Sequence, residues 1–248
     1  MERNSNPRRA ALALLSEAAI LIVAYLAYEA VRLFVTPQSA DAIGRALSLI
    51  HIEQRLGIFF EPHLQRFVVQ HHMLVTLANW IYVWGYLPLI GATALYLFVR
   101  HRDSYSRYRN AFLLSGLIGL VIFATLPVAP PRMLPELGFI DTVQDGSALY
   151  RSFEGSHFVN QFAAVPSFHF GWSLLVGVAI YQTSRNVIAR VASAVLPLLM
   201  LLAILLTANH YLIDAIVGGA VVLLALGAEL LAERRFARRT SAPTIASH

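Results

Sequence analysis

The sequence predicts an all-α membrane protein with six transmembrane helices and interfacial amphipathic helices between spans 1 and 2. Of its 248 residues, 57% are hydrophobic and only 13% are charged. Soluble domains carry roughly 25% charged residues, so a single globular core could not bury this much apolar side-chain surface. The chain also contains long apolar runs, each near the roughly 20 residues that a helix needs to cross the hydrocarbon layer.

Six such runs are candidate spans. They cover residues 10–35, 71–99, 110–127, 168–183, 189–207 and 209–231. The first run is too long for the apolar region of a signal peptide, and no small-x-small cleavage site follows it, so we expect it to be retained. In the second run, Gly85 and Pro88 predict a kink.

The last two predicted spans form an almost unbroken apolar stretch from Val191 to Leu231. As a single helix this stretch would be roughly 60 Å long, about twice the hydrocarbon thickness. The chain therefore has to turn near the middle of the stretch, and Thr207, Ala208 and Asn209 are the only plausible corner. We expect Thr207 or Asn209 to cap the helix that follows.

This division gives four regions of the chain. Residues 1–35 are an N-terminal segment with the first span, 36–70 are interfacial amphipathic helices, 71–232 are a helical core, and 233–248 are a disordered cytoplasmic tail. Apolar and charged residues alternate along 36–70, as they do in helices that lie on a membrane surface. Prolines and glycines in 128–167 predict an ordered loop outside the bilayer.

The placement of arginine predicts the orientation. All 19 basic residues are arginines, and most lie at the N-terminus, between spans 2 and 3, between spans 4 and 5, and at the C-terminus. With six spans these four segments share one side, which the positive-inside rule assigns to the cytoplasm. We therefore expect a multi-pass protein of the cell membrane with both termini cytoplasmic. The net charge of +5 then reflects topology, and we expect no nucleic-acid partner.

Polar residues gather in three segments at the opposite, non-cytoplasmic edge: 130–132 after span 3, 166–169 at the start of span 4, and 209–214 at the start of span 6. His210 and Asp214 are four residues apart, so they share one helix face. A carboxylate at this spacing can hold one imidazole nitrogen and make the other more nucleophilic. Asp214 lies about one turn inside an apolar span, where ionisable groups are costly and are functional candidates. The alternative is a buried polar pair that holds helices together.

The start of span 4 predicts an anion site. Pro166 favours the first turn of a helix. The free backbone N–H groups of that turn attract anions, and the Ser167 hydroxyl could donate to the same anion. His169 lies in this turn. Alone it would equally suit an interfacial polar residue, but paired with His210 it is a candidate functional residue.

Other polar residues on this side are less specific. The guanidinium fork of Arg132 suits bidentate phosphate binding, and its alternative is a headgroup contact or a surface ion pair. Arg151 is a weaker phosphate-binding candidate, for which a surface ion pair is the favoured interpretation. We interpret Glu53 and Glu61 as interfacial structure, and the aromatic residues of 80–86 as an interfacial belt.

Two short motifs carry a resemblance to a known family. The pattern Pro166-Ser167-x-His169, followed by His210-Tyr211-x-x-Asp214, resembles the type-2 phosphatidic acid phosphatase superfamily. Each motif alone is weak, but their order, spacing and shared membrane side make the combination fairly specific. The resemblance implies that residues 71–232 are the helical core of this superfamily.

The resemblance also implies a role for each candidate. His210 would be the nucleophile that attacks phosphorus, Asp214 would orient it, and His169 would protonate the leaving oxygen. Ser167 and Arg132 would hold the phosphoryl oxygens. The family needs no metal or other cofactor, and the sequence shows no convincing metal-binding cluster.

Departures from the family pattern indicate which class of phosphate ester the site accepts. Thr125 and Ile204 occupy positions where the phosphatases carry a lysine and an arginine, and Phe168 replaces a glycine. This pattern looks more like the inositol phosphorylceramide synthase branch, to which residues 129–132 and 56–59 are also similar. A phosphodiester brings one negative charge and a phosphomonoester up to two, so a site with fewer cations suits a diester.

The expected activity is transfer of a phospho-headgroup, with phosphoinositol as the candidate, from a phosphodiester lipid to a lipid hydroxyl or water. One alternative is a phosphatase of lipid phosphates or polyprenyl (pyro)phosphates. Another is a proton-coupled lipid transporter with a His–Asp proton relay, although transporter sites lie near the bilayer midplane and these groups lie at one edge. A metalloprotease is disfavoured because no helix carries two histidines with a glutamate. The expected partners are membrane lipids, and the sequence predicts no oligomeric state.

Overall fold

The computed structural model describes residues 7–34, 39–143 and 161–240, and throughout these ranges the chain is helical or irregular. The sole β-type pairing in this part of the chain is an isolated bridge between Val128 and Ala163, so the all-α prediction is confirmed. The chain divides into two compact units, residues 1–36 and 37–248. The first unit contains the single helix α1, Pro7–Phe34.

The second unit contains the remaining helices. Their bounds are α2 Ser39–Leu56, α3 Glu61–Val68, α4 His72–Trp84, α5 Leu87–Arg100, α6 Arg102–Thr125, η1 Pro131–Met133, η2 Pro135–Leu137, α9 Phe168–Thr183, α10 Val187–Leu206 and α11 Leu212–Thr240. Within the described residues, α6, α10 and α11 are long and apolar enough to cross a membrane, and α4 with α5 gives a fourth candidate if the two form one broken span. The count of six spans stays a prediction.

Both predicted breaks in the apolar stretches occur where expected. Helices α4 and α5 meet at 46°, with Gly85 at the end of α4 and Pro88 in the first turn of α5. Helix α10 ends at Leu206, and Ala208 adopts a left-handed conformation with φ of 52° before α11 begins. The capping prediction is wrong, because the Thr207 hydroxyl donates to the Ala203 carbonyl and the Asn209 side chain is engaged elsewhere.

Helix α11 extends beyond its predicted end. It continues through residues 233–240, which the sequence analysis assigned to a disordered tail. Its last turns are held to α6 by an ion pair between Arg107 Nη2 and Glu233 Oε2, 2.8 Å apart, and by a hydrogen bond from Asn110 to Glu229. The tail prediction is therefore wrong for these eight residues, and residues 241–248 lie outside the described part.

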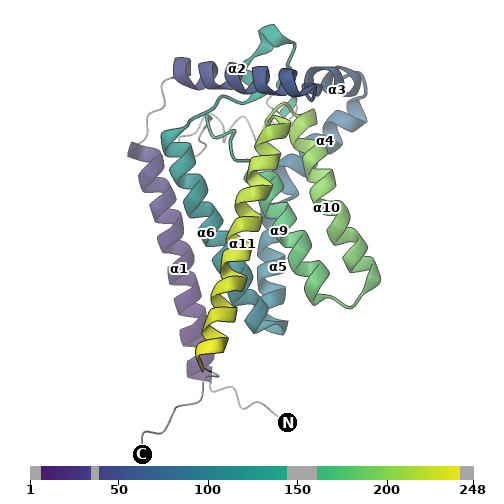
Figure 1. Cartoon of the computed structure of the whole chain (residues 1–248). Helices are drawn as coiled ribbons and strands as arrows, with labels where there is room; N and C mark the ends of the chain where they lie inside the picture. Colours follow the sequence, from purple (N-terminus) through teal and green to yellow (C-terminus); the bar gives the residue numbers. More distant parts are fainter. Residues whose placement is uncertain (1–6, 35–38, 144–160, 241–248) are drawn as a thin grey trace, which may run out of the picture. The chain divides into compact units, whose positions relative to one another are not determined.

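Helices α2 and α3 and the 126–143 segment lie across one end of the helices of this unit (Figure 1). The Arg45 side chain of α2 donates to the Pro127 carbonyl, and Ala129 N–H donates to the Ala42 carbonyl. Ala42, Ala46 and Ile50 of α2 share a buried cluster with Tyr211, which directly precedes α11. The placement of α2 and α3 on a membrane surface stays a prediction.

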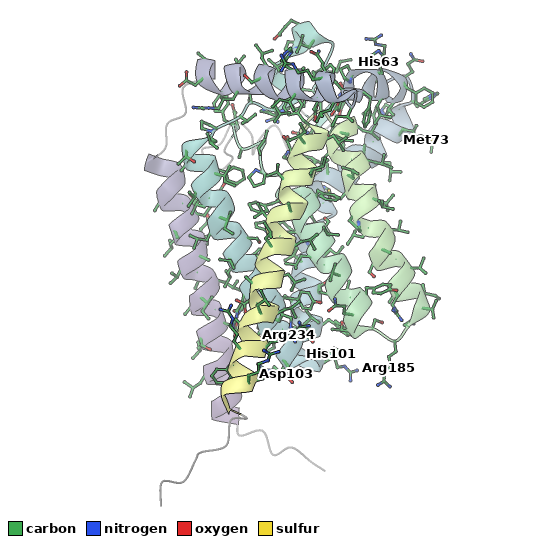
Figure 2. The ribbon with its side chains drawn as sticks, in the orientation of Figure 1. His63, Met73, His101, Asp103, Arg185 and Arg234 are labelled. Carbon is green, nitrogen blue, oxygen red and sulfur yellow. The ribbon has the colours of Figure 1, made fainter. Side chains whose placement is uncertain are left out.

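The opposite end of this unit carries arginines from separate predicted cytoplasmic segments. Figure 2 labels Arg185 and Arg234 there, together with His101 and Asp103, whereas His63 lies at the end covered by α2 and α3. This arrangement agrees with the grouping of Arg185 and Arg234 on one side.

Glycines allow α9 and α11 to approach backbone to backbone. A Cβ at Gly218 would collide with the Ser167 carbonyl, and a Cβ at Gly171 would lie 2.7 Å from the Gly218 carbonyl oxygen. Because real Cβ contacts are never this short, neither position accepts a side chain without a shift of the backbone. The close approach places the start of α9 beside the first turns of α11.

Candidate active site

His210 is held by two acceptors at the buried end of α11. Its Nδ1 lies 2.9 Å from the Ala164 carbonyl oxygen and 3.3 Å from Asp214 Oδ2. Neither partner has a proton to give to His210 when Asp214 is ionised, so Nδ1 carries the proton and Nε2 keeps its lone pair. The ring is therefore oriented with a nucleophilic nitrogen away from the carboxylate.

Asp214 joins the two helices that meet here. Its side chain is fully buried, and Oδ2 also accepts a hydrogen bond from Tyr211 N–H at 2.9 Å. Its backbone carbonyl accepts from Ser167 N–H, also at 2.9 Å. One residue thus fixes both the His210 ring and the residue that precedes α9.

His169 lies next to His210 between two tyrosines. The centroids of the two imidazole rings are 5.5 Å apart. The rings of Tyr82 and Tyr86 each lie 4.3 Å from the His169 ring, and Tyr82 is stacked on it. The sequence analysis interpreted these tyrosines as part of an interfacial belt. Their spacing of four residues across the kink was the signal that could have identified them as neighbours of one side chain.

The start of α9 presents backbone donors. Ser167 is the N-cap residue, with its Oγ 3.5 Å from Phe170 N. Among the described residues, no acceptor bonds to the N–H groups of Phe168 or His169. Two donors at the positive end of a helix dipole are therefore left without a protein acceptor in the described part of the chain, which favours an anion there.

Phe168, which replaces the family glycine, packs away from these donors. Its ring stacks on Trp172 with centroids 4.6 Å apart and meets Phe123 edge-on. A Cβ at Gly119 of α6 would collide with the ring. The bulkier residue is therefore accommodated by a missing side chain on the neighbouring helix.

Arg132 is tied to the segment that precedes His210. Nη1 donates to Asn209 Oδ1 at 2.8 Å, and Nε lies 3.2 Å from Asp141 Oδ2. Its backbone N–H donates to the Ala208 carbonyl. Because the side chain is only 7% exposed, the pair with Asp141 is not a surface ion pair. Neither Asn209 nor Asp141 was expected as a partner from the sequence.

The two positions at which the family pattern has a lysine and an arginine contribute no cation. Thr125 is exposed and its hydroxyl bonds to its own helix, while Ile204 is buried in the core. Arg151 lies outside the described residues. Glu53 and Glu61, which were interpreted as interfacial structure, are instead fully buried and bond to the start of α11.

Comparisons with known proteins agree with the motifs. The family model of the PAP2 superfamily matches residues 47–228, well over half of the chain. A phosphoinositol dihydroceramide synthase of Bacteroides thetaiotaomicron is 27% identical over 185 residues, which cover 68% of this chain and 59% of that relative. The chain thus spans less than two thirds of the relative's length, and no solved structure matches it. The prediction of the family is therefore confirmed. The chain belongs to the PAP2 superfamily.

Proposed function

We propose that the protein is an integral membrane phosphotransferase that moves a phospho-headgroup from a phosphodiester lipid to a lipid hydroxyl or water through a phosphohistidine at His210. The observation that carries the proposal is the convergence of two imidazole rings, 5.5 Å apart, beside the open N–H groups of α9. A tetrahedral phosphoryl group bound at those donors could contact both rings.

In the first half-reaction, His210 Nε2 attacks phosphorus and the bond from phosphorus to the lipid oxygen breaks. His169 gives its proton to the departing oxygen, so the lipid leaves as an alcohol. Asp214 accepts the hydrogen bond from Nδ1–H and stabilises the positive charge that the ring gains when Nε2 is phosphorylated. In the second half-reaction, His169 takes the proton of the incoming alcohol or water, whose oxygen displaces Nε2.

The phosphoryl oxygens are held by the N–H groups of Phe168 and His169 and by the Ser167 hydroxyl. Arg132 completes this set through a guanidinium that Asn209 and Asp141 hold in place. Arg151 is a further phosphate ligand in this proposal. A site without the further lysine and arginine of the phosphatase pattern suits the single negative charge of a phosphodiester.

The substrate proposal rests on two independent supports. The positions of Thr125 and Ile204 supply no cation, which disfavours the doubly charged head of a phosphomonoester. The matched relative is named a phosphoinositol dihydroceramide synthase. We therefore propose phosphatidylinositol as the donor lipid and a lipid hydroxyl as the acceptor. Hydrolysis of lipid phosphates or polyprenyl (pyro)phosphates is the alternative.

The proposed topology has six spans, with α1 and α9 added to the broken α4–α5 pair and to α6, α10 and α11. Arg185 and Arg234 lie at the end away from His63 (Figure 2), and we assign this end to the cytoplasm. With six spans the chain starts and ends on the same side, so both termini are cytoplasmic in this proposal. The imidazoles then face the non-cytoplasmic side, where α2 and α3 lie along the membrane surface.

The test uses the purified full chain with phosphatidylinositol, phosphatidic acid and polyprenyl phosphate, each with and without a lipid alcohol. Release of diacylglycerol together with a new phosphoinositol lipid supports the transferase, whereas release of inorganic phosphate from the monoesters supports the phosphatase. His210→Ala should lose roughly 10⁴-fold or more in kcat, as expected for a covalent nucleophile. His63→Ala, which removes an exposed histidine of α3, is the matched control. A phosphorylated His210→Ala protein would refute the assignment of the nucleophile.

A further inference from the structure

Three buried carboxylates bind three consecutive backbone N–H groups at the start of α11. Tyr211 N–H donates to Asp214 Oδ2, Leu212 N–H to Glu61 Oε1, and Ile213 N–H to Glu53 Oε1, at 2.9, 3.0 and 2.9 Å. All three acidic side chains are 0% exposed. Two of them come from α2 and α3, more than 150 residues earlier in the chain.

The hydrogen bonds distinguish the two glutamates. Glu61 accepts with both oxygens, because Oε1 bonds to Leu212 N–H and Oε2 bonds to Phe60 N–H at 2.9 Å. Both oxygens of Glu61 are thus occupied as acceptors, an arrangement that suits a carboxylate. Glu53 accepts with Oε1 only, and its buried Oε2 has no partner if it is treated as an acceptor.

A proton on Glu53 Oε2 would give this buried oxygen a hydrogen-bond partner. A protonated oxygen becomes a donor, and Glu61 is the adjacent side chain that can accept from it. Burial and the charge of Glu61 raise the pKa of Glu53 to about 8, although the bond from Ile213 N–H opposes the shift. At neutral pH the Glu53 carboxyl therefore keeps its proton.

We propose that Glu53 and Glu61 are positioning residues for phosphoryl transfer, a proton-sharing carboxyl pair that clamps the first turn of α11. The inference rests on the proposed function of His210, which precedes this turn. Neither glutamate is placed on the reacting atoms. They act through the backbone of Leu212 and Ile213, whose position sets the contact between Asp214 and the His210 ring.

The geometry explains why both glutamates are needed. The bond from His210 Nδ1 to Asp214 is 3.3 Å long, so a small rotation of the first turn breaks it. Without their acceptors, the N–H groups of Leu212 and Ile213 would be buried and unpaired, which favours fraying of the turn. The pair also links α2 and α3 to the candidate active site.

The test compares two isosteric variants that should behave differently. Glu53→Gln keeps an oxygen for Ile213 N–H and an N–H donor for Glu61, so we expect kcat to stay within about twofold of wild type. Glu61→Gln has only one oxygen for two N–H groups, so we expect kcat to fall about tenfold with KM unchanged. Glu53→Ala removes the acceptor and should resemble Glu61→Gln, and His63→Ala is again the control.

A pH profile gives a readout that a merely structural role would not move. As the pH rises through about 8, Glu53 loses its proton and faces the charges of Glu61 on α3 and Asp214 on α11. Burial raises the pKa of the neighbouring Tyr211, so that residue stays neutral in this range. We expect kcat of the wild type to fall above pH 8 and Glu53→Gln to lack this step.

The thermal stability of the protein should also depend on the protonation of Glu53. Because the pKa of Glu53 rises from 4.5 to about 8, the native state holds a proton that the unfolded chain releases between these values. The thermal midpoint of the wild type in detergent should therefore decline from pH 4.5 to pH 8, and the decline should be smaller in Glu53→Gln.

Two results would overturn the inference: Glu53→Gln as impaired as Glu53→Ala, or Glu61→Gln with the kcat and pH profile of wild type. If Glu61→Gln does not fold, the profile of Glu53→Gln decides the matter by itself. Failure of the proposed function looks different, because His210→Ala would then remain active whatever the glutamate variants do.

Discussion

The N-termini of α9 and α11 meet at the candidate active site. Both have the positive end of a helix dipole there, but they differ in whether their first backbone N–H groups have protein acceptors within the described part of the chain. At the start of α11, the N–H groups of Tyr211, Leu212 and Ile213 are bonded to buried carboxylates. At α9, the Ser167 cap is long and the N–H groups of Phe168 and His169 have no acceptor among the described residues. A helix end saturated by its own protein cannot bind an anion, whereas an open one can. In the proposed function, the open end of α9 binds the phosphoryl group and the saturated end of α11 holds the nucleophile.

Apart from loss of the nucleophile His210, the largest effect should come from His169 at the open N-terminus of α9. His169→Ala should lower kcat about 10²–10⁴-fold, the usual contribution of general acid catalysis. His169→Phe tests the reason, because it keeps an aromatic ring between Tyr82 and Tyr86 but has no proton to give. Both variants should be equally impaired in steady-state turnover of the lipid. Recovery in His169→Phe would mean that His169 acts by packing.

A smaller effect should follow from pushing the two helix ends apart. Gly218→Ala places a Cβ against the Ser167 carbonyl, and we expect a loss of about 1–3 kcal/mol of stability from this overpacking. The thermal midpoint should fall by about 2–4 °C per kcal/mol. Gly227→Ala on the same helix is the control, since a Cβ there has nothing within 4 Å. Equal midpoints for the two variants would contradict the close approach.

The smallest effect should come from Ser167→Ala. The variant loses the N-cap of α9 and one donor to the phosphoryl group, and the lost hydrogen bond to that group is worth about 1 kcal/mol. We expect kcat/KM to fall about fivefold, which is the ratio that this free energy gives. Ser193→Ala, which removes a buried hydroxyl of α10, serves for comparison. A larger loss in Ser193→Ala than in Ser167→Ala would argue against an anion site at α9.

The sequence predicted those parts of the fold that depend on local patterns. The apolar runs located the helices, Gly85 and Pro88 located the bend, and the excessive length of 191–231 located the corner. The span count placed His169 and His210 at the same membrane edge, and the spacing of four residues placed His210 beside Asp214.

Long-range partners escaped this reasoning. Glu53 and Glu61 occur in an amphipathic stretch in which exposed acids are the rule, and nothing local reveals that they bond to residues 212 and 213. The helical character of 233–240 was missed for the same reason, because Arg107 contacts Glu233 from a distant helix. Such contacts depend on the assembled fold and not on periodicity.

The pairing of Gly119 with Phe168 has a consequence for protein engineering. The aromatic ring fills the volume that a side chain on α6 would take, so the two positions form a single packing unit. A chimera that transplants the glycine of the phosphatase motif to position 168 would leave a hole unless a bulkier residue were grafted at 119. Exchanging residues 119 and 168 together would replace the motif and keep the packing between α6 and α9.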